Sequence, residues 1–279
     1  MTKKTIVVAT DFSPNANRVA CFAAQLARDW KAKLTLLNTY HFWPDNPAKT
    51  GDFPMSREAM REESRTKLSQ LADHLHEYVG ADLPIHWIAQ EGQTLAAIRA
   101  VTLAEQADLL VMSTVGTAPH SVQFLGSVAT DMIDESNVPL LLVPPTVDYT
   151  AIHNLVMGVD PETPPNAIAL DTAIRFARQF NSVVNVVCVS QQPTDPTIHQ
   201  RTQQIREMML PVPHTLTVLP GDDVFNTLIG FAHNNKADLV VMLPQPRQGS
   251  LLHRLERLFT DSETERMARL TDVPLLVVA

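Results

Sequence analysis

Short apolar runs alternate along this chain with longer segments whose apolar residues recur at helical spacing. In the first half the runs cover residues 6–10, 34–38, 84–89, 108–112 and 140–143, and the helical segments cover 15–30, 57–79, 94–106 and 127–135. The runs are apolar at consecutive positions, which is typical of strands buried on both faces of a mainly parallel sheet. Strand-then-helix alternation favours right-handed crossovers with helices on both sides. We therefore predict a doubly wound α/β domain with a five-stranded sheet.

The second half repeats this order. Its predicted strands are 155–159, 183–189, 215–219, 239–242 and 275–278, and its helices are 165–180, 197–209, 224–234 and 262–271. The two halves also share similar stretches of sequence: Ala107–Met112 corresponds to Ala237–Met242, and Val138–Val143 corresponds to Val273–Val278. A period this long indicates a duplicated domain rather than a solenoid. We predict tandem domains at 1–146 and 147–279, joined by a short linker that begins with two prolines.

The last predicted strand of each copy is an apolar sheet edge. An apolar edge strand is an aggregation hazard unless it is paired. We therefore expect strand 140–143 to pair with strand 275–278, which would join the two domains into a pseudo-symmetric body.

Charge and composition narrow the function classes. The net charge of −8 and the pI near 5.6 disfavour nucleic acid and anionic membranes as partners. No apolar run reaches the roughly 20 residues that would span a bilayer. Asp11 interrupts the first apolar run too early for a signal-peptide core, and Cys21 and Cys188 fall at non-equivalent places in the two copies. We expect a cytoplasmic protein.

Three segments of the first half are predicted to converge beyond the carboxyl ends of the strands, where doubly wound sheets bind ligands. Asp11 follows the first strand, Thr39 the second, and the segment with Gly116 and then Gly126-Ser127 follows the fourth. Glycines let backbone amides approach an anion, and a helix that begins at Ser127 would favour a phosphate. The alternative is that Gly126 only ends a loop and Ser127 caps the helix.

These residues resemble a known family. Thr10-Asp11-Phe12-Ser13, Gly92 before a helix, Ala107-Asp108-Leu109 and the spacing Gly116-x9-Gly126-Ser127 are similar to those of the universal stress protein family. The resemblance covers essentially the whole chain as a tandem pair. Family members that bind ATP carry the pattern G-x2-G-x9-G-[ST], and in this chain Ser113 stands at the first glycine.

The resemblance implies a site for ATP or a related adenine nucleotide, with Mg²⁺, in the first domain. It would place the adenosine end at Ala9, Thr10 and Asp11, and the base pocket at Thr39 and Met112. The phosphates would lie along a segment made of Ser113, Gly116, Gly126, Ser127 and Val128.

Two departures from the pattern weaken this expectation. Ser113 adds a side chain and must accept the backbone angles of a glycine, and residues 117–124 contain no Lys or Arg to help hold a triphosphate. The second copy departs further, since Leu243, Pro246 and Asp261 occupy the three glycine positions. We interpret the second domain as a non-binding, structural or partner-facing copy.

By resemblance, the chain is a stress-response module that works by nucleotide occupancy, without catalysis. It would present a changed surface to an unknown protein partner, and homodimerisation could add to the internal pairing of domains. One alternative is a ligand-independent interaction protein. A slow nucleotide hydrolase is a weaker one, because no Walker lysine and no paired catalytic acid are found. Metal and hydrolase motifs such as H-E-x-x-H and G-x-S-x-G are also absent from the sequence.

Overall fold

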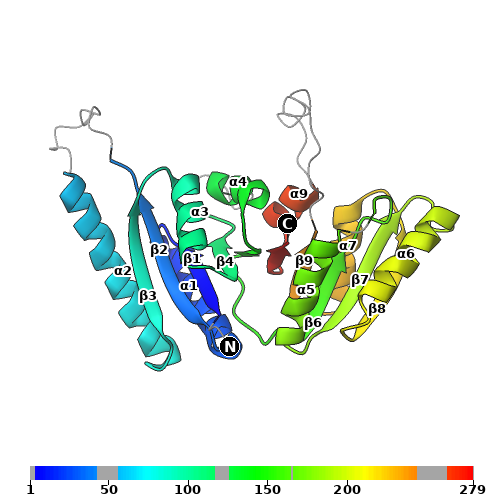
Figure 1. Cartoon of the computed structure of the whole chain (residues 1–279), viewed down its shortest axis with the longest axis horizontal. Coiled ribbons are helices and arrows are strands. Elements are labelled where there is room, and N and C mark those ends of the chain that lie inside the picture. Colours follow the sequence, from blue (N-terminus) through cyan, green and yellow to red (C-terminus); the bar gives the residue numbers. More distant parts are fainter. Residues whose placement is uncertain (1–3, 43–55, 117–125, 165, 244–262, 279) are drawn as a thin grey trace.

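The computed structural model describes residues 4–42, 56–116, 126–164, 166–243 and 263–278 (Figure 1). The strands are β1 (Thr5–Ala9), β2 (Lys33–Tyr40), β3 (Ile85–Glu91), β4 (Leu109–Ser113), β5 (Leu140–Val143), β6 (Asn154–Gly158), β7 (Val183–Ser190), β8 (His214–Pro220), β9 (Leu239–Met242) and β10 (Leu275–Val277). The helices are α1 (Pro14–Trp30), α2 (Arg57–Val79), α3 (Thr94–Ala104), α4 (Ser127–Glu135), α5 (Ala167–Gln179), α6 (Pro196–Met208), α7 (Val224–Asn234) and α9 (Glu263–Leu270).

All the described strands form one sheet with the order β3-β2-β1-β4-β5-β10-β9-β6-β7-β8. The order reads the same in both halves when each is followed from its outer edge to the centre. Neighbours within each half are parallel, as between β1 and β2 or β6 and β7. The expected pair of doubly wound, five-stranded domains is confirmed. The boundary between residues 146 and 147 stays a prediction; it falls in the segment between β5 and β6.

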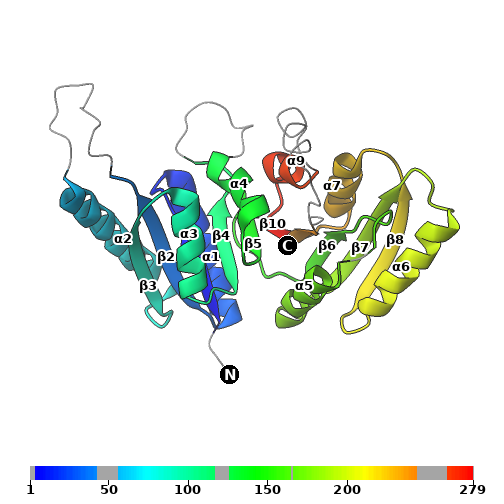
Figure 2. The ribbon, with the colours of Figure 1, turned by 45° about the horizontal axis from the view of Figure 1, so that its top comes forward.

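The two halves join where β5 and β10 pair in antiparallel orientation, as expected from their apolar edges. Leu142 lies opposite Leu275, Leu141 opposite Leu276 and Leu140 opposite Val277. Each of these side chains is buried. The halves therefore lie side by side in the ribbon, with α4 and α9 next to each other over the junction (Figures 1 and 2).

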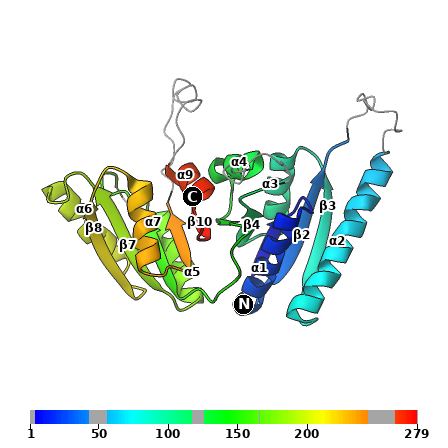
Figure 3. The same ribbon diagram turned by 180° about the vertical axis from the view of Figure 1, so that it is seen from behind.

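Helices cover both faces of the sheet, and each face has one continuous apolar core that spans the two halves (Figure 3). Helices α1, α2, α5 and α6 pack on one face, through side chains such as Leu26, Leu68, Phe176 and Ile205. Helices α3, α4, α7 and α9 pack on the other, through Ile98, Met132, Leu228 and Met267. Because strands are covered on both sides, their consecutive residues are apolar, as the sequence pattern requires.

Local chemistry sets most helix starts. Ser13 caps α1 by accepting from the Ala16 N–H, with Pro14 in the first turn. The predicted helix 165–180 begins only at Ala167, because the Asn166 side chain accepts from the next amides as an N-cap. Strand β3 runs on to Glu91, past its predicted end at residue 89, because it stays paired with β2 as far as Tyr40. A ladder hydrogen bond does not require an apolar side chain, so hydropathy misses such strand ends.

Shortening Leu276 should weaken the junction selectively. Leu276→Ala removes a fully buried side chain opposite Leu141 and should lower the free energy of unfolding by about 2–5 kcal/mol. Leu270→Ala on α9, where the side chain is 47% exposed, serves as the control and should change it by less than about 0.5 kcal/mol. Urea denaturation followed by circular dichroism measures both. If both variants lowered the free energy of unfolding equally, the β5–β10 contact would contribute no more to stability than an exposed residue of α9.

Candidate functional site

The carboxyl ends of β2, β1 and β4 meet at one edge of the first half, with β1 in the middle (Figure 1). The chain leaves β1 at Ala9 for α1 on one face and leaves β4 at Ser113 for α4 on the other face. Neighbouring connections that part to opposite faces leave a crevice at this switch point, where doubly wound proteins bind ligands. The structure therefore brings together the elements that carry the predicted site residues.

The segment after β1 is a tight turn that its own side chains hold. The Thr10 hydroxyl accepts from the Phe12 N–H at 3.0 Å, and Asp11 Oδ1 accepts from the Ser13 N–H at 3.0 Å. Phe12 has φ of +62°, which is uncommon for a bulky residue. Backbone strain of this kind persists where the surroundings over-determine the conformation, and it concentrates at binding sites. The turn presents the Asp11 carboxylate at the edge of the sheet.

A short polar relay from α2 supports this turn. The Asn38 amide donates to the Thr10 carbonyl oxygen at 2.7 Å, and the Ser64 hydroxyl donates to Asn38 Oδ1 at 2.8 Å. Ser64 is buried on the face of α2 that meets the sheet. The sequence analysis did not single out this serine. Its helical spacing from Leu68 and Leu71 places Ser64 on the buried face of α2. That spacing does not show that the serine hydroxyl bonds to Asn38.

Gly116 and Gly126 lie close to each other and to Asp11. The Gly126 N–H donates to the Thr114 carbonyl oxygen at 2.9 Å. A Cβ on Gly116 would stand 3.3 Å from Asp11 Oδ2, a tight contact that would make the carboxylate shift slightly. A Cβ on Gly126 would meet its nearest atom, the Gly116 nitrogen, at an ordinary 3.7 Å.

Backbone geometry does not explain glycine at position 126. Its φ of −60° and ψ of 139° are accessible to any residue. Neither these dihedral angles nor packing against the described residues demands glycine at this position.

The N-terminus of α4 is uncapped by side chains of the described residues. Gly126 is the N-cap and supplies no side chain, while Ser127 is the first helical residue. The alternative that Ser127 caps this helix is therefore wrong. Free amides at a helix start carry partial positive charge and favour an anion.

Ser113 fits the backbone better than the sequence suggested. It is the last residue of β4, where it pairs with Val143, and it is not among the described residues with positive φ. Its hydroxyl donates to the Val115 carbonyl oxygen at 2.8 Å and accepts from the Val115 N–H at 3.2 Å. The serine thus braces the segment after β4, and the expected conflict with glycine-like angles does not arise.

Three of the remaining predicted residues pack in the apolar core beside this edge, and the fourth, Thr39, lies near the end of β2. Met112, Ala9 and Val128 belong to the core on the α3/α4 face, Met112 being buried and the other two half-buried. Thr39 remains half-buried near the end of β2, beside Gln90 of β3. Such a wall of apolar side chains beside polar turn groups suits a flat ring with a polar attachment.

Two basic side chains of α2 lie near the carboxyl-end edge of the sheet, and each contacts an acidic residue and an aromatic ring. The Arg57 Nε is 3.1 Å from Glu91 Oε1, and its guanidinium stacks 5.4 Å from the Phe42 ring centroid. The Lys67 Nζ is 2.6 Å from Glu63 and 5.7 Å from the Phe12 ring centroid. The sequence analysis looked for cations only in residues 117–124, which lie outside the described residues, and therefore missed these two.

The corresponding edge of the second half is closed by its own side chains. Val189, the counterpart of Thr39, is buried at the end of β7 together with Ser190. A Cβ on Gly158, the counterpart of Ala9, would collide with Leu228 Cδ2 at 2.7 Å. This packing supports the interpretation of a non-binding copy. Its positions 246 and 261 lie outside the described residues.

An internal ion pair also fills the second edge. The Arg266 guanidinium of α9 lies 3.1 Å from Asp223 Oδ1 and 4.9 Å from the Phe225 ring centroid. Hydrogen bonds from Asn226 and the Arg266 charge lower the pKa of Asp223 below its usual value. An ion pair already satisfied in this way leaves little to attract an added anion.

Together these features define a tandem α/β protein of two doubly wound domains whose described switch-point residues differ. A family model described as "Universal stress protein family" matches residues 3–144. The chain therefore belongs to the universal stress protein family.

Individual relatives agree with this assignment. The "Universal stress protein in QAH/OAS sulfhydrylase 3'region" of Thermus aquaticus is 31% identical over 142 residues, which are 50% of this chain and 98% of that protein. The crystal structure of a universal stress protein from Archaeoglobus fulgidus covers 98% of this chain and 95% of its own, at 16% identity and a TM-score of 0.71. A universal stress protein in complex with cAMP matches 52% of this chain and 100% of its own, at 22% identity and a TM-score of 0.41. At these identities the structural likeness shows the fold alone.

The described residues also lack two other features. None of their helices is long and apolar enough to cross a membrane. No group of three His, Cys, Asp or Glu side chains in the same part of the chain is arranged to hold a metal ion.

Removing the Ser64 hydroxyl should loosen the turn after β1. Ser64→Ala leaves Asn38 Oδ1 without this donor and should lower the free energy of unfolding by about 1 kcal/mol. Thr66→Ala, an exposed position on the same helix, is the control and should stay within about 0.5 kcal/mol of the parent. Urea denaturation measures both. A Ser64→Ala variant as stable as the control would show that the relay does not support the turn.

Proposed function

We propose that the first domain binds an adenine nucleotide such as ATP at the edge formed by β1, β2 and β4, and that the protein acts through occupancy of this site. The observation that carries the proposal is the pair of glycines beside the uncapped start of α4. Among the described residues, neither the conformation nor the packing of Gly126 requires glycine, which supports a role for this glycine in giving an anion access to the α4 amides.

Each part of a nucleotide has a matching surface. The adenine ring would lie along the apolar side near Met112 and Thr39, and the ribose hydroxyls would reach the Asp11 carboxylate. The phosphates would meet the amides at Gly126, Ser127 and Val128. Mg²⁺ would accompany the triphosphate rather than require a protein cage, which is its usual mode with nucleotides.

The proposed role is non-catalytic because the acidic group at the site serves the turn. Asp11 Oδ1 accepts from the Ser13 amide, and Asp11 Oδ2 faces Gly116, which suits a residue that orients a ligand. Phosphoryl transfer needs cations aimed at the transferred group. The two cations described near this edge instead lie over the Phe42 and Phe12 rings.

Occupancy would act through a shift between two states of the protein. A nucleotide that binds one arrangement of the segment after β4 more tightly would favour that arrangement and change the surface offered to a protein partner. Without a basic clamp, the expected affinity is modest, and the site would respond to the large concentration changes of an abundant nucleotide.

Thermal unfolding with ATP and Mg²⁺ tests the proposal. At a tenfold excess over Kd, ATP should stabilise the protein by about 1.4 kcal/mol, which corresponds to roughly 3 °C for a chain of this size. Gly126→Asp places a carboxylate at the start of α4, repels phosphate and should abolish the shift. Gly230→Asp adds the same charge on α7, where a Cβ meets nothing within 4 Å, and should keep the shift.

The outcomes separate the candidate functions. A shift lost only in Gly126→Asp supports nucleotide binding at this edge. No shift in the parent protein would contradict it and favour the ligand-independent interaction protein. Release of phosphate at a steady rate, lost in the same variant, would favour the slow hydrolase over pure occupancy.

A further inference from the structure

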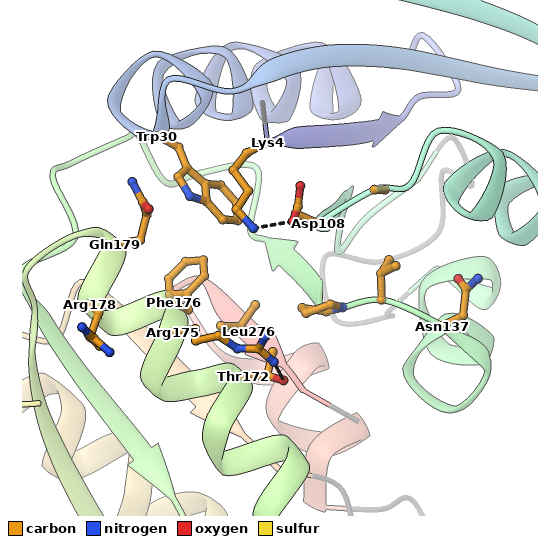
Figure 4. Close-up of a pocket in the computed structure, with 13 residues that line it drawn as sticks. Lys4, Trp30, Asp108, Asn137, Thr172, Arg175, Phe176, Arg178, Gln179 and Leu276 are labelled. Atoms are coloured by element: carbon orange, nitrogen blue, oxygen red, sulfur yellow. Dashed lines mark hydrogen bonds and ion pairs between the residues drawn. The ribbon is translucent and has the colours of Figure 1, made fainter. Parts of the chain in front are cut away.

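A pocket of about 620 Å³ opens between the two domains, at the end of the sheet opposite the nucleotide edge (Figure 4). On the first-domain side, Lys4, Asp108 and Pro139 line it just before β1, β4 and β5 begin. On the second-domain side, α5 lines it through residues from Thr172 to Gln179. The pocket is large enough for a small organic molecule, and its walls come from both domains.

Aromatic rings form one wall. Trp30, at the end of α1, packs edge-on against Phe176 of α5 with ring centroids 5.7 Å apart. The Trp30 Nε1 is buried and has no hydrogen-bond partner in the described part of the chain. An unsatisfied buried donor costs stability. The Trp30 and Phe176 rings give this wall an apolar surface.

Positive charge dominates the rest of the lining. Lys4, Arg175 and Arg178 line the pocket against one carboxylate, Asp108, a net charge of +2 (three minus one). Asp108 is already paired with Lys4 at 2.6 Å.

The second-domain cations are available to an occupant. Arg175 pairs with Asp171 at 3.0 Å, and both side chains are more than 60% exposed. An exposed pair one helical turn apart contributes little, so Arg175 can exchange it for a ligand. Arg178 makes no side-chain hydrogen bond or ion pair with the described residues. The lining therefore selects an anion.

Helix α1 of the first domain corresponds to the pocket-lining helix α5 of the second, and its equivalent surface already binds an aromatic side chain. Helices α1 and α5 are both followed by a left-handed residue, Lys31 and Asn181, which aligns Phe22 with Thr172 and Asp29 with Gln179. There the linker residue Tyr149 packs edge-on against Phe22 at 5.2 Å and donates its hydroxyl to Asp29.

Helix α5 carries different residues from α1 at the equivalent positions, so the pocket beside α5 would suit a different ligand. Thr172 leaves room where Phe22 stands on α1. Gln179 removes the acidic acceptor that Asp29 supplies to the Tyr149 hydroxyl, and Arg175 stands where α1 carries Gln25. The α1 surface binds the phenol ring of Tyr149. The corresponding α5 surface would instead suit an aromatic ring that carries a carboxylate.

We propose that the interdomain pocket is a second ligand site, for a small aromatic carboxylate whose ring lies against Trp30 and Phe176 and whose carboxylate pairs with Arg175. Because Trp30 and Phe176 belong to different domains, an occupant bridges the two halves beside the β5–β10 junction. This site is separate from the nucleotide edge and does not depend on it.

Calorimetric titration with 2-naphthoate tests the proposal on the full chain. Arg175→Gln should weaken binding by about tenfold, the value of one charge-assisted hydrogen bond. Thr172→Phe copies Phe22, fills the space and should abolish binding. Arg28→Gln removes the same charge from α1, outside the pocket lining, and should leave the affinity within about twofold.

A neutral probe isolates the role of charge. 2-Naphthamide should bind the parent protein about tenfold more weakly than 2-naphthoate and should not distinguish it from Arg175→Gln. Circular dichroism shows whether each variant is folded. If Thr172→Phe does not fold, the affinity of Arg175→Gln alone tests the proposal. Gly126→Asp should bind 2-naphthoate normally, which separates this site from the nucleotide edge. No binding at millimolar 2-naphthoate, or equal affinity in the parent, Arg175→Gln and Thr172→Phe, would overturn the proposal.

Discussion

The antiparallel pairing of β5 with β10 is the contact on which the rest of this structure depends. Each strand alone would be an apolar edge, which a soluble protein must cover. Pairing them makes one sheet of two and lets one core run along each face across both domains. It also brings the end of α1 against α5, where Trp30 meets Phe176, and so creates the pocket between the domains.

The duplicated architecture separates what the fold needs from what a ligand needs. Both copies keep the strand order, yet the switch-point edges differ. In the first copy the N-cap of α4 is Gly126, which has no side chain, and Thr39 is partly buried. In the second, Val189 is buried and Arg266 is bound to Asp223. Since both copies fold alike, these features of the first edge are not requirements of folding, and we propose that they serve a ligand.

The two proposed sites lie at opposite ends of the same strands, and they differ in origin. The nucleotide edge arises within one domain from β1, β2 and β4. The interdomain pocket exists only because two domains share a sheet, and its specificity follows from the divergence of α5 from α1. A ligand that contacts both Trp30 and Phe176 would tie the domains together, whereas a nucleotide at Gly126 would act on one of them alone. The protein could therefore report two chemical signals independently.

The sequence by itself determined the elements, the duplication and the edge pairing, because consecutive apolar runs and capped helices are local patterns that leave few topologies. It also placed Asp11, Gly116 and Gly126 near one another. Only the tertiary structure decided that Ser113 adopts ordinary backbone angles, that Ser64 supports the turn through Asn38, and that Arg175 faces Lys4 across a pocket. These contacts join residues far apart in the chain. Their geometry follows from how helices and domains pack, which spacing along the sequence does not encode.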